Sequence, residues 1–201
     1  GKPSFKGYGS EGNKYPASVC TSVNEEIVHG IPGERILREG DIVSLDIGTN
    51  LNGYFGDSAV TVGVGEISEI ANNLIKTTRK CLFSGIKEAI NGNFVGDISH
   101  AIQHIAENNH FSVVREFVGH GVGLEVHEDP QIPNYGKPKT GLKLESGMVI
   151  AIEPMVNQGD FRTICCPDGW TVVTADGSLS AHFEHTIAIF EEGNEILTLF
   201  K

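Results

Sequence analysis

Two acidic residues lie inside a predicted β-hairpin, where a buried strand normally carries apolar side chains. Residues 42–62 alternate with the period of strands on both sides of a turn. A turn centred on residues 51–52 places Asp46 directly opposite Asp57, and a turn centred on residues 52–53 places Asp57 diagonally beside it. Either register holds the two β-carbons roughly 5 to 8 Å apart. Like charges at that separation destabilise the hairpin unless a proton or a cation lies between them.

Two further acidic residues lie in strand-like apolar segments. Glu153 ends the apolar run 148–152, and Glu184 lies within residues 181–189. A single acidic residue of this kind is most simply explained by a solvated strand face or by hydrogen bonds. Four in one chain indicate a metal site instead, because two divalent ions would neutralise four carboxylates. Oxygen ligands suit manganese, iron, cobalt and zinc.

One imidazole would complete such a site, and His120 is the best candidate among the eight histidines. It lies in residues 117–123, where glycines allow the backbone to approach a ligand closely. This segment does not match the dinucleotide-binding fingerprint, because Leu124 occupies the last glycine position. His29 and His127 lie in loops beside predicted tight turns, and for both residues a functional and a surface role are equally open.

Three other histidines are predicted to be exposed to solvent. His100 and His104 have the four-residue spacing of a helical zinc pair, but Ala101 stands where that motif needs a glutamate. They share one face of a predicted helix with acidic residues, a pattern typical of a solvated surface. His110 is excluded as a metal ligand together with them.

The order of predicted elements favours an α+β fold, with a mainly antiparallel sheet and helices grouped on one side. Apolar residues recur at three- and four-residue steps from Ser68 to about Ile90, which predicts a long amphipathic helix. A second helix is predicted to contain Asp97 to Glu107. Strands are predicted at residues 42–48, 54–62, 111–118, 148–153, 171–174 and 181–190.

The composition of the chain limits which partners and which cellular compartment we expect. With 201 residues, 39% of them hydrophobic, the chain is long enough for one buried core, so residues 1–201 are interpreted as a single domain. A formal net charge of -11 offers no basic surface for nucleic acid. No apolar run approaches the roughly 20 residues that cross a membrane. Four cysteines without a CxxC pair, and no signal peptide at the start, favour the cytoplasm.

Seven short motifs resemble, in order along the chain, those of the bacterial-type (type I) methionine aminopeptidases, from about Phe5 to Leu199. The resemblance implies a pita-bread fold, which is a curved, mainly antiparallel α+β domain with helices on its outer side. It also implies two divalent metal ions in the cleft, of cobalt, manganese, iron or zinc. The motifs are residues 24–32, 45–47, 56–58, 119–123, 127–130, 152–155 and 183–186.

The resemblance assigns metal-binding roles to the residues already selected. Its five ligands correspond to Asp46, Asp57, His120, Glu153 and Glu184, with Asp57 and Glu184 bridging both ions. Metal ions in such a centre lower the pKa of a shared water, and the bridging hydroxide then attacks the first peptide bond. Glu153 is the best candidate to carry the proton from that water to the leaving nitrogen.

Substrate-binding residues also follow from the resemblance. His127 corresponds to a residue that hydrogen-bonds the scissile amide and stabilises the tetrahedral intermediate, and His29 to one that contacts the substrate near the leaving side. A pocket for the methionine side chain corresponds to Tyr8, Tyr15, Cys20 and Trp170, with Phe5 and Val126 at its edges.

The implied activity is removal of the N-terminal methionine from nascent proteins and peptides whose second residue is small. Its setting is the cytoplasm, near the ribosome, with neither nucleic acid nor membrane as a direct partner. Three departures from the family are expected to matter. Residues 9–14 form a longer segment, Val126 replaces an aromatic residue of some members, and the helical segment that usually precedes the catalytic domain is missing from residues 1–201.

Other proteins share this fold, so the fold alone does not select the activity. Creatinase, which uses no metal, and non-catalytic binding modules are disfavoured because all five ligand positions hold competent residues. Aminopeptidase P and prolidase usually carry a separate N-terminal domain, which this sequence does not contain. A peptide-binding protein derived from a truncated aminopeptidase is the non-enzymatic alternative.

Overall fold

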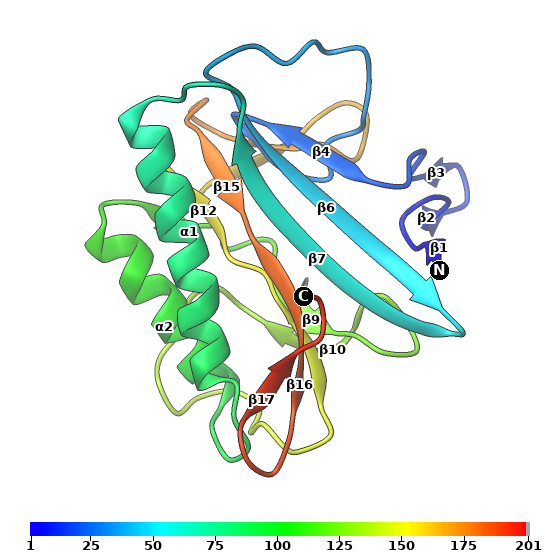
Figure 1. The fold of residues 1–201 in the computed structure, drawn as a ribbon, viewed down its shortest axis with the longest axis vertical. Coiled ribbons are helices and arrows are strands. Elements are labelled where there is room, and N and C mark those ends of the chain that lie inside the picture. The colour runs from blue at the N-terminus through cyan, green and yellow to red at the C-terminus, as the bar shows by residue number, and fades with distance from the viewer. Residues whose placement is uncertain (200–201) are drawn as a thin grey trace.

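One curved antiparallel sheet runs through the molecule (Figure 1). The computed structural model describes residues 1–199. The predicted α+β class, with a mainly antiparallel sheet, is confirmed. Along the sheet the order is β1 (Lys2–Pro3), β6 (Ile42–Leu51), β7 (Tyr54–Gly63), β16 (Glu184–Ile189), β11 (Val149–Ile152), β9 (Gly119–Gly121) and β10 (Glu128–Ile132), while β4 (Cys20–Val23) pairs with β6 and β17 (Asn194–Ile196) pairs with β16.

Short strands form three smaller sheets beside the main one. Two of them bring together segments that are far apart in the sequence, and the third is a local hairpin within the first fifteen residues, which lack strand periodicity. The first consists of β15 (Ser180–His182), β12 (Met155–Asn157) and β8 (Ser112–Val113), the second of β13 (Thr163–Cys165), β14 (Val172–Thr174) and β5 (Glu26–Val28), and the third of β2 (Gly9–Ser10) and β3 (Asn13–Lys14).

Two strand predictions are wrong in extent. The run 181–190 is not one strand, because Phe183 interrupts it and leaves β15 and β16 in different sheets. At the break, the Phe183 amide donates to the carbonyl of Pro154 at 3.3 Å. The run 111–118 contains only the two-residue strand β8. Most apolar residues of both runs are buried, although Phe190 is 48% exposed, but the backbone bends between layers instead of continuing along one strand.

The hairpin β6–β7 carries the second of the two predicted registers. Asp46 pairs with Ala59, and Asp57 pairs with Gly48, so the two carboxylates are diagonal neighbours on one face. Asn52 and Gly53 form the turn with φ angles of 55° and 90°, the left-handed conformation that a two-residue hairpin requires. The face that holds the carboxylates is buried.

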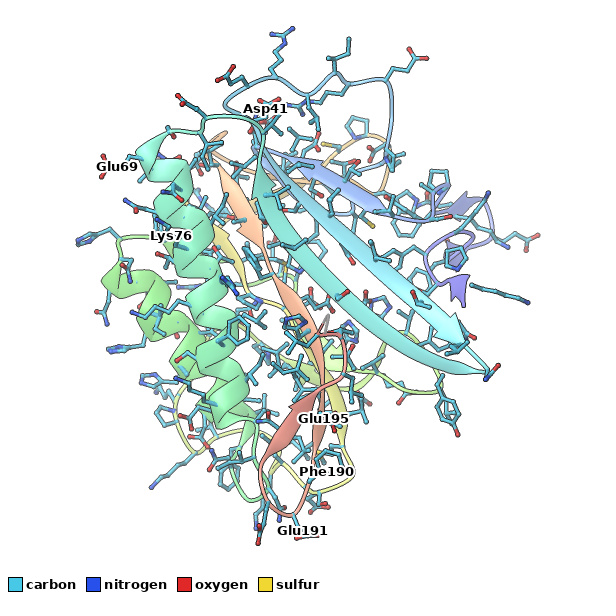
Figure 2. The ribbon with its side chains drawn as sticks, in the orientation of Figure 1. Asp41, Glu69, Lys76, Phe190, Glu191 and Glu195 are labelled. Atoms are coloured by element: carbon cyan, nitrogen blue, oxygen red, sulfur yellow. The ribbon has the colours of Figure 1, made fainter. Side chains whose placement is uncertain are left out.

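Two helices lie side by side over one face of the strands that follow them in the sequence (Figure 1). Helix α1 (Glu69–Glu88) begins at Ser68, whose hydroxyl accepts from the Ala71 amide at 3.2 Å, and α2 is Val95–Asn108. Figure 2 shows Glu69 and Lys76 projecting from α1 into solvent. The buried face of both helices packs with strand residues into one core that includes Leu74, Leu82, Ile98, Ile102, Ile150 and Ile187.

Neither helix in residues 1–199 combines the length and apolar content needed to cross a membrane. The four cysteines are unpaired. Cys20 and Cys81 are buried, while Cys165 is exposed and Cys166 is partly exposed. The core is therefore held by packing and strand pairing, as the cysteine spacing predicts.

Candidate active site

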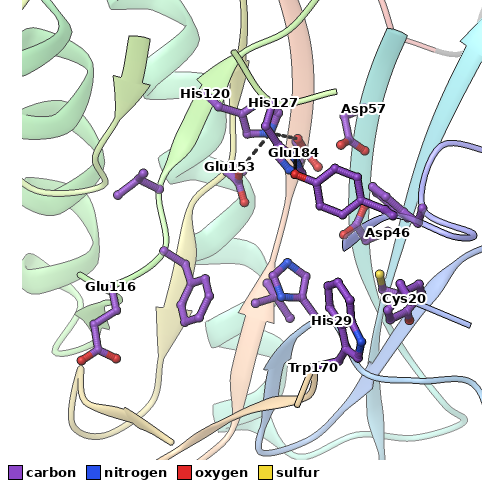
Figure 3. Close-up of a pocket in the computed structure, with 16 residues that line it drawn as sticks. Cys20, His29, Asp46, Asp57, Glu116, His120, His127, Glu153, Trp170 and Glu184 are labelled. Atoms are coloured by element: carbon purple, nitrogen blue, oxygen red, sulfur yellow. Dashed lines mark hydrogen bonds and ion pairs between the residues drawn. The ribbon is translucent and has the colours of Figure 1, made fainter. Parts of the chain in front are cut away.

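A cavity of about 330 Å³ opens on the buried face of the hairpin β6–β7, and Figure 3 shows its lining. His120, His127, Asp57, Glu153 and Glu184 gather at one end, whereas His29 lies beside Trp170 and Glu116 lies farther away (Figure 3). The site residues predicted from the sequence border this one cavity, except Val126, which packs in the aromatic cluster beside it: Phe5, Tyr8, Tyr15, Cys20, His29, Asp46, Asp57, His120, His127, Glu153, Trp170 and Glu184.

The five predicted metal ligands come from five strands that are consecutive in the main sheet. Asp46 lies on β6, Asp57 on β7 and Glu184 at the start of β16, while Glu153 directly follows β11 and His120 lies on β9. Neighbouring strands lie about 4.8 Å apart. One side chain from each of several adjacent strands therefore meets the next across the curved face, although the sequence separates them widely.

The ligand atoms fall into two groups that share one residue. Oxygen atoms of Asp46, Asp57 and Glu184 lie within 4.8 Å of one another, and atoms of His120, Glu153 and Glu184 satisfy the same limit. Because Glu184 belongs to both groups, it lies between two neighbouring positions that could each hold a cation. This arrangement suits a pair of ions bridged by a carboxylate.

Burial makes the carboxylate cluster costly in the absence of a cation. Asp46, Asp57 and Glu184 are 8%, 3% and 2% exposed. Burial, followed by the charge of Asp57, raises the pKa of both Asp46 and Glu184 well above the usual range. Burial and the charge of Glu153 raise the pKa of Asp57 to about 7. Burial also raises the pKa of Glu153 to about 7, against the opposing influence of His120.

The donor atoms of the cluster fit a divalent metal. Asp46 Oδ1 and Glu184 Oε1 are buried and accept no hydrogen bond from any residue in the range 1–199. His120 Nδ1 lies 2.8 Å from the Gly121 carbonyl oxygen, which places the proton on Nδ1 and leaves the Nε2 lone pair available. That Nε2 lies 3.4 Å from Glu153 Oε1 and 4.0 Å from Glu184 Oε1. Carboxylate oxygens with one imidazole nitrogen suit manganese, iron, cobalt and zinc.

Two more histidines line the cavity, and the pKa of each is lowered from its usual value. The rings of His127 and His120 have centroids 4.4 Å apart. Burial, followed by the neighbouring His120 and His29, lowers the pKa of His127 to about 4. Burial and the neighbouring His182 lower the pKa of His29 to about 4. Each ring can therefore donate one hydrogen bond and accept another without carrying a charge.

Aromatic side chains build the other wall of the cavity. Tyr15 is 2% exposed, donates from its hydroxyl to the Gly30 carbonyl at 2.7 Å, and meets Trp170 edge-on at 5.2 Å. Phe5, Tyr15, Cys20 and Val126 form one buried cluster against which Trp170 packs. The longer segment 9–14 is the hairpin β2–β3, and Gly9 allows its backbone to lie directly against the Trp170 ring.

Several residues of the site are not identified from the sequence. Val28, Glu116, Phe117 and Val118 also line the cavity. His182 is 2% exposed and places Nε2 3.5 Å from Glu153 Oε2. Its position two residues before Glu184 in an alternating run is a signal that could have selected it, since such residues share a strand face.

The predicted surface histidines lie away from the cavity. His100, His104 and His110 are exposed, and the first two stack along α2 with ring centroids 5.7 Å apart. The Nε2 atom of His104 is 2.9 Å from Asn108 Nδ2. Their four-residue spacing therefore forms a solvated helix face, as predicted.

The sequence and the structure of this chain are similar to those of known proteins. The family model described as metallopeptidase family M24 matches residues 3–191. Methionine aminopeptidase 1 of Bacillus subtilis (strain 168) is 58% identical over 196 residues, which cover 98% of this chain and 77% of that protein. Methionine aminopeptidase of Clostridium acetobutylicum is 56% identical over 198 residues, with 98% and 78% covered. A crystal structure of methionine aminopeptidase from Thermotoga maritima superposes with a TM-score of 0.95 at 55% identity, covering 99% of this chain and 79% of that chain.

These similarities extend over almost the whole chain and agree with one another. They confirm the resemblance that the seven motifs indicate, and they confirm the pita-bread fold. The chain therefore belongs to metallopeptidase family M24, among the methionine aminopeptidases of the bacterial type.

Proposed function

We propose that this chain hydrolyses the first peptide bond of proteins and peptides and so removes their N-terminal methionine. The observation that carries the proposal is the pair of buried ligand groups sharing Glu184, which open into a cavity with an aromatic wall. An exopeptidase needs a site that binds a free amino terminus beside a device that activates water. Carboxylates with unpartnered oxygens at one end of the cavity could bind the amino terminus and hold the metal ions that activate water.

Two divalent ions fit the two ligand groups. Asp46, Asp57 and Glu184 would hold one ion, and His120, Glu153 and Glu184 the other, while Asp57, which also lies within 4.8 Å of His120, would serve with Glu184 as a ligand shared by both. Bound ions supply Lewis acidity, which lowers the pKa of a water molecule and polarises the scissile carbonyl. The donor set accepts cobalt, manganese, iron or zinc, and the choice among them in the cell depends on metal availability as well as on geometry.

Glu153 is placed to move the proton that hydrolysis requires. Its carboxylate borders the cavity, with one oxygen 3.4 Å from His120 Nε2, and a carboxyl group within hydrogen-bond reach of the water can serve first as a base and then as an acid. It accepts a proton from the attacking water and delivers it to the leaving nitrogen. His182 Nε2 lies 3.5 Å from its second oxygen.

His127 and His29 act on the substrate as neutral groups. In this proposal, His127 donates a hydrogen bond to the scissile carbonyl oxygen, where negative charge develops in the transition state. His29 meets the substrate on the leaving side, where its ring packs against Phe117 at 5.7 Å and against Trp170 at 6.4 Å. This crowded edge favours a small second residue.

The aromatic wall accounts for a preference for methionine. Tyr15, Cys20 and Trp170 offer an apolar, polarizable surface that suits an unbranched thioether. N-terminal methionine is carried by newly made proteins, so the proposed substrates are nascent chains in the cytoplasm, near the ribosome. Neither nucleic acid nor a membrane is needed as a direct partner.

Four dipeptide substrates with added manganese or cobalt test the proposal: Met-Ala, Leu-Ala, Lys-Ala and Met-Leu. We expect Met-Ala to be cleaved fastest. Leu-Ala should be slower by about 10-fold or more but still cleaved, because a hydrophobic pocket discriminates only weakly between apolar side chains. Lys-Ala and Met-Leu should be poor substrates. Efficient turnover of Lys-Ala would contradict the methionine preference and leave the two-metal aminopeptidase intact, whereas no cleavage of any substrate would contradict both.

A further inference from the structure

The hydroxyl of Tyr8 forms a hydrogen bond to the ring of His127. The distance from Tyr8 Oη to His127 Nδ1 is 2.8 Å, and the ring centroids lie 5.1 Å apart with an interplanar angle of 57°. The contact joins residues that are 119 positions apart, at the end of the cavity where His127 meets His120. A tyrosine that only lined an apolar pocket would not require this contact.

The chemistry of the two groups determines which of them donates. A phenol is a much stronger acid than the N–H of a neutral imidazole, and an imidazole nitrogen accepts more strongly than a phenol oxygen. The favoured bond therefore runs from the Tyr8 hydroxyl to an unprotonated Nδ1. Because a neutral ring carries one proton, that proton lies on Nε2 of His127.

The fixed tautomer matters because Nε2 is the nitrogen left to contact a substrate. One ring nitrogen of His127 lies within 4.8 Å of ligand atoms of Asp57 and His120, so the ring borders the reacting end of the cavity. A protonated Nε2 can donate to a developing oxyanion, whereas an unprotonated Nε2 would repel it. With the opposite tautomer, the same ring in the same place would lose this function.

Backbone hydrogen bonds fix the position of Tyr8, so its hydroxyl can hold the His127 ring in one orientation. Its amide donates to the Phe5 carbonyl at 2.9 Å, and its carbonyl accepts from the Tyr15 amide at 2.8 Å. The hairpin β2–β3 begins at the next residue, Gly9, whose φ angle of 108° and close approach to Trp170 leave no space for a side chain. The segment 9–14 therefore anchors the residue that orients His127.

We propose that the Tyr8 hydroxyl is a positioning group that fixes neutral His127 in the tautomer with its proton on Nε2, ready to donate to the substrate carbonyl. The catalytic consequence rests on the proposed function, but the tautomer itself does not. Tyr8 acts through His127 and is distinct in this respect from the residues that only line the methionine pocket.

Nitrogen-15 NMR of histidine-labelled, zinc-loaded protein reads the tautomer directly, since zinc is diamagnetic. Comparison with His127→Ala assigns the signal. We expect the Nε2–H pattern in the unmodified chain and a mixture of tautomers in Tyr8→Phe, which keeps the ring and removes only the hydroxyl. Tyr54→Phe, at an exposed tyrosine outside the cavity, is the matched control and should leave the pattern unchanged. An Nδ1–H pattern in the unmodified chain overturns the proposal.

Kinetics on Met-Ala test whether the tautomer is used. Tyr8→Phe should lower kcat about 10-fold with KM nearly unchanged, the scale of one hydrogen bond. It should cause no further loss in a His127→Ala background. A rise in KM with kcat unchanged, an equal loss in both backgrounds, or an altered tautomer with full activity each overturns the proposal. If the unmodified chain cleaves no Met-Ala, the proposed function fails, and the NMR result alone decides the tautomer.

Discussion

The molecule brings metal-ligating residue types together in two regions, and the regions differ in almost every other respect. On α2, His100 and His104 stack in solvent at 5.7 Å, and His104 already has a polar partner in Asn108. In the cavity, Asp46 and Glu184 are buried with oxygen atoms that no residue in the described chain satisfies. In both regions, metal-ligating side chains lie close to one another. A buried, unpartnered ligand atom is found in the cavity cluster and marks it as a binding site.

The energetic consequences follow from this difference. Water stabilises the exposed histidines whether or not a metal is bound, so a metal adds little to them. Within residues 1–199, the ion-pair contacts of the buried ligand carboxylates involve histidines alone. A cation relieves both their mutual repulsion and their lost hydration. Four measurements sharpen or break this contrast.

Loss of a cluster ligand should have the largest effect. We expect chelation to abolish peptidase activity, and Asp57→Asn to lose metal and to lower activity by more than about 10²-fold, since even residues that only support a metal ligand contribute 10- to 100-fold. Metal content and turnover on Met-Ala are the measurements. Glu107→Gln, on the exposed face of α2, is the matched control and should retain both. Full activity in excess chelator would contradict the assignment of the cluster.

Removal of the His127 ring should have the next largest effect. His127→Ala should lower kcat by about 10²-fold, the usual contribution of one hydrogen bond to a transition-state oxyanion. Metal content should stay unchanged, because the five proposed ligands remain. Steady-state kinetics with parallel metal analysis separate these two outcomes. A loss of metal equal to that of Asp57→Asn would instead make His127 a ligand.

Metal binding should release protons, to an extent that depends on pH. The pKa values of Asp57 and Glu153 are raised to about 7, so below that pH the metal-free cluster holds protons that a metal must displace. We expect release of about one proton or more near pH 6 and less near pH 8.5, with affinity falling as the pH falls. His29, His127 and His182 titrate near pH 4 and stay neutral in this window. Calorimetry in buffers of different ionisation enthalpy measures the release, and a pH-independent value would argue against buried, protonated carboxyl groups.

The smallest effect is expected on α2. His100→Ala and His104→Ala should each change stability by no more than about 0.5 kcal/mol, as is usual at solvated positions, and should leave activity unchanged. Thermal melting and turnover on Met-Ala are the measurements. Losses comparable to that of His127→Ala would mean that the helix face contributes to function, and the contrast between the two regions would fail.

The carboxylate cluster could be predicted from the sequence because residues 42–62 keep the alternation that is typical of strands. Alternation fixes the face of Asp46 and Asp57, and Asn52-Gly53 supplies the turn that selects their register. The Asn52-Gly53 pair could have separated the two registers beforehand, because Asn-Gly is the strongest two-residue hairpin signal and the alternative centre contains Leu51. Glu184 was selected because it interrupts an apolar run, the same signal that selected Asp46.

The sequence pattern does not show where a strand-like run bends from one sheet into another. Phe183 stands between His182 and Glu184 as the alternation of a single strand would place it, so the pattern does not mark the break between β15 and β16. Phe5, Tyr8 and Tyr15 belong to an opening segment without periodicity, so their place in the cavity followed from family resemblance alone. Their positions depend on the hairpin β2–β3 and on contacts with Trp170, which are long-range.

The order of the ligands along the chain has a mechanical consequence. Strands β6 and β7 are joined by ten residue pairs, but β7 and β16 by two, Glu184 with Ala59 and His185 with Ser58. That short seam joins the early hairpin to the late strands, and the ligand groups span it. An ion held by Asp46, Asp57 and Glu184 would close loops of more than a hundred residues, as a covalent cross-link does. The proposed metal centre would therefore also stabilise the contact between the two halves of the sheet.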